Sequence, residues 1–117
     1  MLPKDLRLKE NRQINKTFKN GLHKKSDHFF YKYIKSQNPL KFCITAAKKH
    51  KLNKPQRNKF KRQISHAIYN SLSIKPEIKN LNFNIIIVLH TIPKGKDYYK
   101  TMKLEIKNFL NKLQNEQ

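Results

Sequence analysis

The sequence predicts an α+β domain: a two-layer sandwich of one small mixed sheet with helices, in the order helix, strand, strand, helix, strand, helix. Three observations support this prediction. An alternating aromatic segment and a β-branched segment indicate strands, and apolar residues spaced by three and four indicate helices. A chain of 117 residues has room for one hydrophobic core. We therefore interpret residues 1–117 as a single domain.

A basic N-terminal arm leads into the first predicted helix. Asn11 is a suitable cap for its start, and Gly21 supplies a stop near its end. The apolar residues Ile14, Phe18 and Leu22 recur at the four-residue spacing of one helix face. We therefore expect a short helix with one apolar side.

The two strands that follow carry different patterns. From His28 to Ile34, aromatic residues occur with the period of two that places neighbours on opposite faces of a strand. Residues 41–47 form a second apolar run, and Asn38-Pro39 marks a turn between the two. Because the connection is short, we expect these strands to pair as an antiparallel hairpin.

The second helix begins at Asn53 or Lys54, with Pro55 in its first turn, where a missing amide donor does no harm. Five apolar residues share one stripe of this helix: Phe60, Ile64, Ala67, Ile68 and Leu72. At about 100° per residue, a neighbouring flank is basic and polar: Lys54, Asn58, Lys61, Arg62 and Ser65. One side is therefore expected to face the core and another a polyanion.

The last strand and helix are strongly apolar. A β-branched run lies within residues 83–89 and predicts a central strand that is buried on both faces. After a turn, Asp97 is expected to cap a helix with one apolar face. The residues of this face are Tyr98, Met102, Ile106, Phe109, Leu110 and Leu113.

The charge of the chain is large and uneven. There are 27 Lys and Arg residues against 7 Asp and Glu, which gives a net charge of +20. Eight basic residues and no acid fall in the fifteen positions from Lys48 to Arg62. Neutralising phosphates releases condensed counterions, so this segment is expected to hold nucleic acid, and RNA is the favoured partner.

Part of this charge has a simpler explanation. The chain is rich in Lys, Asn and Ile, which drift in genomic base composition can produce. Such drift does not explain why two of the only four Arg residues, Arg57 and Arg62, flank one six-residue segment. Arg offers a planar fork of donors that Lys lacks, so these positions indicate a geometric requirement.

Groups that could cleave RNA are not gathered in the sequence. General acid-base catalysis uses well-placed His residues, and metal catalysis uses grouped carboxylates. The five His and seven acidic residues are scattered, although a fold could bring some together. Phosphate-binding loops, zinc spacings and dinucleotide fingerprints are absent from the sequence. We therefore interpret the chain as a binding protein.

The aromatic residues of the strand and the first helix are each better explained as core, yet one face of the strand is left available for single-stranded nucleic acid; these residues are Phe18, Phe29, Phe30, Tyr31 and Tyr33. Aromatic rings beside Lys suit unstacked bases, and a strand has two faces, of which only one needs to pack on helices. The lone Cys43 is expected to be a buried small hydrophobe rather than a nucleophile, since it has no disulfide partner. The sequence contains no export signal or membrane-spanning run, which predicts a cytoplasmic protein.

These residues together resemble the bacterial ribonuclease P protein subunit. The resemblance rests on Ala47-Lys48-Lys49, followed after seven residues by Arg57-Asn58-Lys59-Phe60-Lys61-Arg62 at a helix start. It extends to Leu6-Arg7-Leu8 and to the aliphatic strand from Ile85 to Leu89, and so covers almost the whole chain. It implies the ribosomal protein S5 domain 2-like fold.

The family supplies a function that the residues alone do not. In it the RNA subunit is the catalyst, and magnesium ions are bound mainly by that RNA. The holoenzyme is an endonuclease, a hydrolase that removes the 5′ leader of precursor tRNA. The resemblance thus implies ribonuclease P RNA and precursor tRNA as partners, with no membrane or DNA partner and no catalytic or metal-binding residue in the protein.

The resemblance also assigns residues to two contact surfaces. Contacts with the RNA subunit are implied for Lys48, Lys49, Arg57, Asn58, Lys59, Lys61 and Arg62. A cleft for the single-stranded leader would be lined by Ile14, Phe18, Phe30 and Lys32. Ile14 and Lys32 stand where the family often has aromatic residues, so this cleft is expected to depend more on charge and less on stacking.

Two other functions are compatible with the composition. A small basic ribosomal or general RNA-binding protein would make purely structural contacts. A regulator that binds duplex DNA is a weaker alternative, because no helix-turn-helix pair or dimer seam is evident. The pattern from Ala47 to Arg62, together with cleavage of precursor tRNA in the presence of a ribonuclease P RNA, distinguishes a ribonuclease P protein subunit from these two alternatives.

Overall fold

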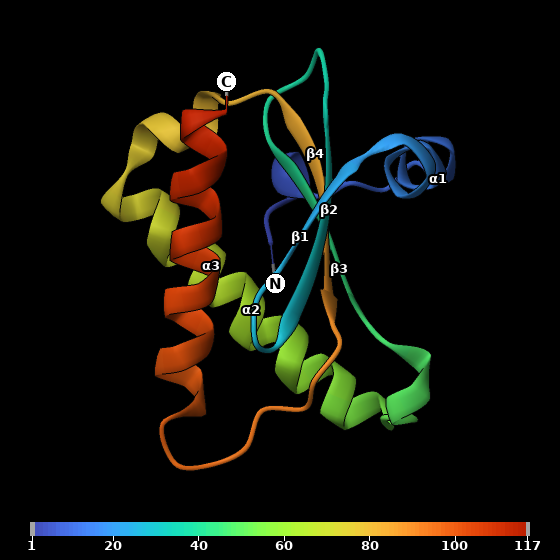
Figure 1. Ribbon diagram of the computed structural model, residues 1–117, viewed down its shortest axis with the longest axis vertical. Coiled ribbons are helices and arrows are strands. Elements are labelled where there is room, and N and C mark those ends of the chain that lie inside the picture. Colours follow the sequence, from blue (N-terminus) through green and yellow to red (C-terminus); the bar gives the residue numbers. More distant parts are fainter. Residues whose placement is uncertain (1, 117) are drawn as a thin grey trace.

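The computed structural model describes residues 2–116, which form a four-stranded sheet with helices on both faces (Figure 1). The strands, in their order across the sheet, are β1 (Leu22–Lys25), β2 (Phe29–Lys35), β4 (Phe83–Leu89) and β3 (Lys41–Ala46). The first three are antiparallel neighbours, and β3 runs parallel to β4. The predicted α+β class with one mixed sheet is confirmed.

Three helices flank this sheet. In Figure 1, α1 (Asn11–Asn20) lies on one face, and α2 (Lys54–Ile74) and α3 (Tyr98–Asn115) lie on the other. Short 3-10 turns occur at η1 (Lys4–Leu6), η2 (Lys48–His50) and η3 (Pro76–Asn80). Among the described residues, no helix combines the length and apolar character needed to cross a membrane.

The strand β1 was not predicted from the sequence. Leu22, expected on the apolar side of the first helix, instead begins β1 and is 63% exposed. The strand contains a single apolar residue, so its sequence has no alternating pattern, and it forms through backbone pairing with the edge of β2. The observed order is therefore helix, strand, strand, strand, helix, strand, helix.

The predicted hairpin between β2 and β3 is wrong. β4 lies between these two strands, pairing antiparallel with β2 and parallel with β3. Ile85, Ile86 and Ile87 of β4 are all fully buried, which confirms the prediction of a central strand covered on both faces. The most apolar strand gains most from two neighbours, and this gain outweighs the short connection that favoured a hairpin.

Helix boundaries follow the predicted positions, with two differences at the caps. Asn11 is the first residue of α1, and Glu10 occupies the cap position. Asp97 lies at the cap position of α3, but its side chain makes no capping hydrogen bond. Gly21 ends α1, and a Cβ there would clash with the carbonyl oxygens of Thr17 and Tyr33. Only glycine therefore permits so direct a passage from α1 into β1.

The core lies between the sheet and the pair α2 and α3. The predicted apolar stripes of both helices are buried there, apart from the half-buried Phe60 and Tyr98. Phe109 of α3 stacks on Tyr31 of β2 with a ring-centroid distance of 4.0 Å and an angle of 4° between the ring planes. Offset stacking of this kind adds about 1 kcal/mol to the burial of the rings.

Candidate nucleic-acid interface

The basic segment, residues 48–62, joins the end of β3 to the first turns of α2. It starts in the turn η2, which ends at Lys51 in the left-handed backbone conformation, with φ 49° and ψ 41°. For a residue with a Cβ this conformation costs about 1–2 kcal/mol. The surrounding structure therefore imposes the path of this turn.

A capping box starts α2 inside the basic segment. The Gln56 backbone N–H donates to Asn53 Oδ1 at 2.9 Å, and the Asn53 N–H donates to Gln56 Oε1 at 3.1 Å. Pro55 occupies the first turn, as the sequence predicted. These local contacts fix where the helix begins, and so fix the directions in which the basic side chains of its first turns project.

Most of the residues predicted to contact the RNA subunit are solvent exposed. The exposed residues are Lys48, Lys49, Arg57, Asn58, Lys59 and Arg62. Of the five residues predicted to share one flank of α2, three line one groove, Lys54, Asn58 and Arg62, whereas Ser65 is buried. Lys61 is half-buried and faces elsewhere, since it lines a cavity of about 170 Å³ with Arg7 and Cys43. The structure thus brings six of the seven to the surface and sets Lys61 apart.

The residues predicted to contact the leader belong to α1 and to the sheet face that α1 covers. Ile14 is half-buried, and Phe18 is 42% exposed. Phe30 and Lys32 alternate with the buried Tyr31, so they lie on the opposite face of β2 from the core. The alternation thus divides this strand into a buried core face and a half-buried face beneath α1, and the availability of that second face to RNA stays a prediction.

A third side chain joins Phe30 and Lys32. His23 of β1 lies opposite Lys32 in the register and stacks on Phe30, with 5.9 Å between ring centroids and 16° between planes. The Lys32 ammonium is 5.9 Å from the centre of the Phe30 ring. We call His23, Phe30 and Lys32 the aromatic platform. Sequence reasoning missed His23 because β1 itself was not predicted.

The other flank of α1 faces a more polar groove of about 600 Å³. Arg12, Lys16 and Lys35 line it, together with Asn84 of β4. Asn84 is buried and donates to Gln13, while its Oδ1 has no hydrogen-bond partner among the described residues. Sequence reasoning did not predict this groove, although Arg12, one of only four arginines, was a signal that could have pointed to it.

Cys43 is half-buried on β3 rather than fully buried as expected. Burial raises the pKa of its thiol, and the positive charge of Lys61 only partly offsets this effect. A thiol with a raised pKa stays protonated near neutral pH and is a poor nucleophile. This electrostatic environment favours the interpretation of Cys43 as a packing residue.

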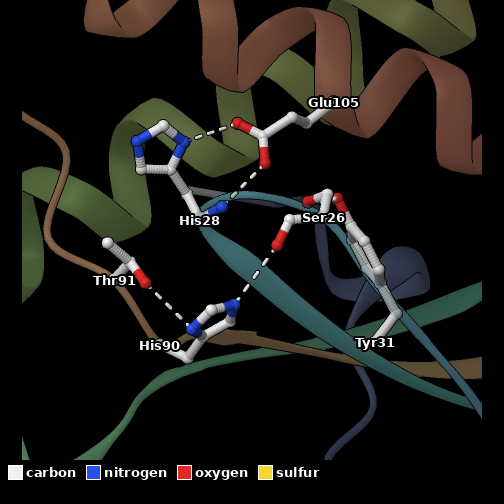
Figure 2. Close-up of polar contacts among 6 residues, drawn as sticks. All are labelled: Ser26, His28, Tyr31, His90, Thr91 and Glu105. Carbon is white, nitrogen blue, oxygen red and sulfur yellow. Dashed lines mark hydrogen bonds and ion pairs between the residues drawn. The ribbon is translucent and has the colours of Figure 1, made fainter.

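The fold does gather some of the scattered histidines and acids (Figure 2). His28 Nδ1 lies 2.6 Å from Glu105 Oε2, and the His28 backbone N–H donates to Glu105 Oε1 at 2.9 Å. Both carboxylate oxygens are therefore occupied in tying α3 to the turn before β2. Among residues 2–116, no three His, Cys, Asp or Glu side chains form a cluster able to hold a metal ion.

Comparison with known proteins adds the following findings. The model of a family described as Ribonuclease P matches residues 2–114. No curated protein matches the chain. The solved ribonuclease P protein from Thermotoga maritima is 19% identical, and the match covers 91% of this chain and 96% of that one with a TM-score of 0.66.

Two further solved structures share the fold. The Staphylococcus aureus ribonuclease P protein is 20% identical, and the match covers 94% of this chain and 93% of that one with a TM-score of 0.55. The Thermotoga maritima protein in complex with 1-(4-fluorophenyl)-2-thiourea is 20% identical, with coverage of 89% and 96% and a TM-score of 0.64. Each match spans almost the full length of both chains.

Proposed function

The chain belongs to the bacterial ribonuclease P protein family, and from this premise we propose that it binds the catalytic RNA subunit and the 5′ leader of precursor tRNA. In this proposal the RNA subunit performs the hydrolysis with magnesium ions bound mainly by the RNA, in the cytoplasm. The protein promotes endonucleolytic removal of the leader through positioning and electrostatics. It thereby takes part in the maturation of the tRNA 5′ end.

The observation that supports this proposal best is the placement of two different surfaces near one end of the sheet. The basic segment leaves the sheet directly after β3, where Ala46 pairs with Leu89, and Leu89 pairs with Phe29 at the start of β2. The platform residue Phe30 is therefore two strand spacings, about 10 Å, from the strand that leads into the basic segment. The two surfaces therefore lie near the same end of the sheet, with the platform on the face that α1 covers and the helix α2 on the other face (Figure 1).

The two surfaces suit two kinds of RNA. Exposed Lys and Arg side chains bind the phosphates of a folded RNA, where sequence is of little importance. A ring beside a cation suits an unpaired base, which can stack on Phe30 while its phosphate lies near Lys32. We assign the basic segment to the RNA subunit and the aromatic platform, with Ile14 and Phe18, to the leader.

Electrostatics explains how such a protein lowers the requirement for magnesium. Leader, tRNA and RNA subunit are all polyanions, and their mutual repulsion opposes assembly. Each Lys or Arg at the junction neutralises a phosphate and releases its condensed counterion. Because exposed charges are screened over about 10 Å at 0.1 M salt, this help is local and falls with ionic strength.

The decisive experiment measures cleavage of precursor tRNA by a ribonuclease P RNA at a magnesium concentration where that RNA alone is nearly inactive. We expect the protein to restore cleavage and to yield the correct 5′ end. Precursor and mature tRNA should then be compared as competitors, since only the precursor carries a leader. Tight RNA binding without rescue would refute the proposal and favour a structural RNA-binding role.

A further inference from the structure

Three histidines tie together the end of the sheet from which the basic segment departs. His28 precedes β2, His50 ends the turn η2, and His90 follows β4. We call them the histidine junction. Figure 2 shows His28 and His90 at this end, where the turn between β1 and β2 approaches the chain beyond β4. Each of these histidines makes a hydrogen bond to a residue far from it in the sequence, so the junction exists only in the folded chain.

His90 is the centre of the junction. Its backbone N–H donates to the His28 carbonyl at 3.0 Å, and its ring Nε2 lies 3.2 Å from the Ser26 carbonyl. Since a carbonyl only accepts, Nε2 carries the proton, and Nδ1 can accept from the Thr91 hydroxyl at 2.9 Å (Figure 2). His90 thus holds the turn that leads into β2 and its Phe30.

The backbone carbonyl of His90 accepts a hydrogen bond from the basic segment. His50 Nε2 lies 2.7 Å from the His90 carbonyl oxygen, and must be the donor of this hydrogen bond. Within the described chain, this is the one side-chain hydrogen bond that links residues 48–52 to another element. The turn has two backbone bonds of its own, from His50 to Ala47 and from Lys51 to Lys48, and the N–H of its cap residue Ala47 donates to the Leu89 carbonyl.

The turn needs such an anchor for a geometric reason. It ends at Lys51 in the left-handed conformation, which a lysine adopts at a cost, so the isolated segment would prefer other paths. Lys48 and Lys49 lie inside the turn, are exposed, and make no ion pair within the described residues. The His50 bond is, within the described residues, the one side-chain anchor beside these two lysines.

From this geometry we propose that His50 is a positioning residue for RNA binding. It holds Lys48 and Lys49 at a set distance from the aromatic platform by donating to His90, which also holds the turn before β2. The proposal rests on the proposed function, because the benefit of fixed lysines is contact with the RNA subunit. His50 itself acts through its neighbours and need not touch RNA.

A double-mutant cycle with ribonuclease P RNA tests this role. We expect His50→Ala to weaken RNA binding about fivefold and to reduce the salt slope by about one, because the lysines remain but are no longer fixed. In a Lys48→Ala/Lys49→Ala background, the same change should alter the affinity by less than about 1.5-fold. His50→Gln should restore binding, since its amide N–H can donate to the same carbonyl.

The outcomes separate positioning from other roles. An equal loss in both backgrounds would overturn the proposal, because a direct contact or a general loss of stability does not depend on the lysines. No loss in either background would overturn it as well. His50→Phe is the matched control, since it keeps a planar ring without the donor and should behave like His50→Ala.

A measurement on the free chain separates this inference from the proposed function. Amide hydrogen exchange at His50 and Lys51 reports the two backbone bonds of the turn without any RNA. We expect exchange there to rise about tenfold in His50→Ala and to stay near wild type in His50→Gln. Unchanged exchange would refute the anchor even if the chain binds RNA. Failure of the wild-type chain to bind ribonuclease P RNA, with exchange altered as expected, would refute the proposed function alone.

Discussion

The two faces of β2 both carry aromatic residues, three on one face and Phe30 alone on the other, but the faces have different environments. Phe29, Tyr31 and Tyr33 are at most 2% exposed and pack toward α2 and α3. Phe30, on the other face, is half-buried. Its ring stacks on the His23 ring and lies beside the Lys32 ammonium. An aromatic residue in this strand is therefore not always a core residue, because its burial depends on the helices that cover its face.

The largest difference between the faces should appear in stability. Phe109→Ala removes the ring stacked on Tyr31 and leaves a cavity, and should lower the free energy of unfolding by about 3–5 kcal/mol. Phe30→Ala should cost less, about 1 kcal/mol, because the Phe30 side chain is only half-buried. Urea denaturation of both variants measures this. Similar losses would mean that the platform face is as well packed as the core.

The core face should also be sensitive to alkali. Burial, followed by a hydrogen bond with Glu116, raises the pKa of Tyr33 to about 12 from an ordinary 10.0. A raised pKa stabilises the folded state, and this contribution is fully present below pH 10. As the pH rises from about 10 to about 12, the free energy of unfolding should fall by about 2 kcal/mol. Unfolding followed across this range should show the loss. Tyr33→Phe should remove the contribution of Tyr33 and leave that of Tyr31, whose pKa burial also raises; a profile identical to wild type would contradict the expectation.

Loss of the platform should affect substrate choice rather than folding. Phe30→Ala is expected to weaken binding of precursor tRNA relative to mature tRNA by about 1 kcal/mol, the lower end of the range for one stacked base. Competition binding to the assembled holoenzyme measures the preference. Tyr69→Ala is a suitable control, because Tyr69 is 58% exposed on α2 and remote from the platform in sequence and fold. An equal effect of both changes would remove the platform from the leader site.

The smallest expected effects concern single charges of the basic segment. Arg57→Ala and Arg62→Ala should each reduce the salt slope of binding to the RNA subunit by about one, since each loses one phosphate contact. Lys112→Ala removes the same charge from the exposed surface of α3 and should leave the slope unchanged. Titrations at several salt concentrations decide this. Equal slopes for all three variants would show that only total charge matters.

Sequence reasoning predicted the helices well and the sheet incompletely. The spacing of Ile64, Ile68 and Leu72, and the capping residues around Pro55, are local signals that specify α2 wherever it packs. Strand neighbours depend on contacts between residues far apart in the chain. For this reason β1 was missed, and the place of β4 between β2 and β3 was not foreseen.

The sequence by itself determined the class of the domain, its helices, its central strand and the concentration of charge from Lys48 to Arg62, because periodicity, capping and charge are properties of short segments. Only the tertiary structure decided the strand order, the stacking of His23 on Phe30, and the bond from His50 to His90. Each of these depends on register and on the docking of distant elements. Such long-range choices minimise exposed apolar surface across the whole molecule, and no short window of sequence records them.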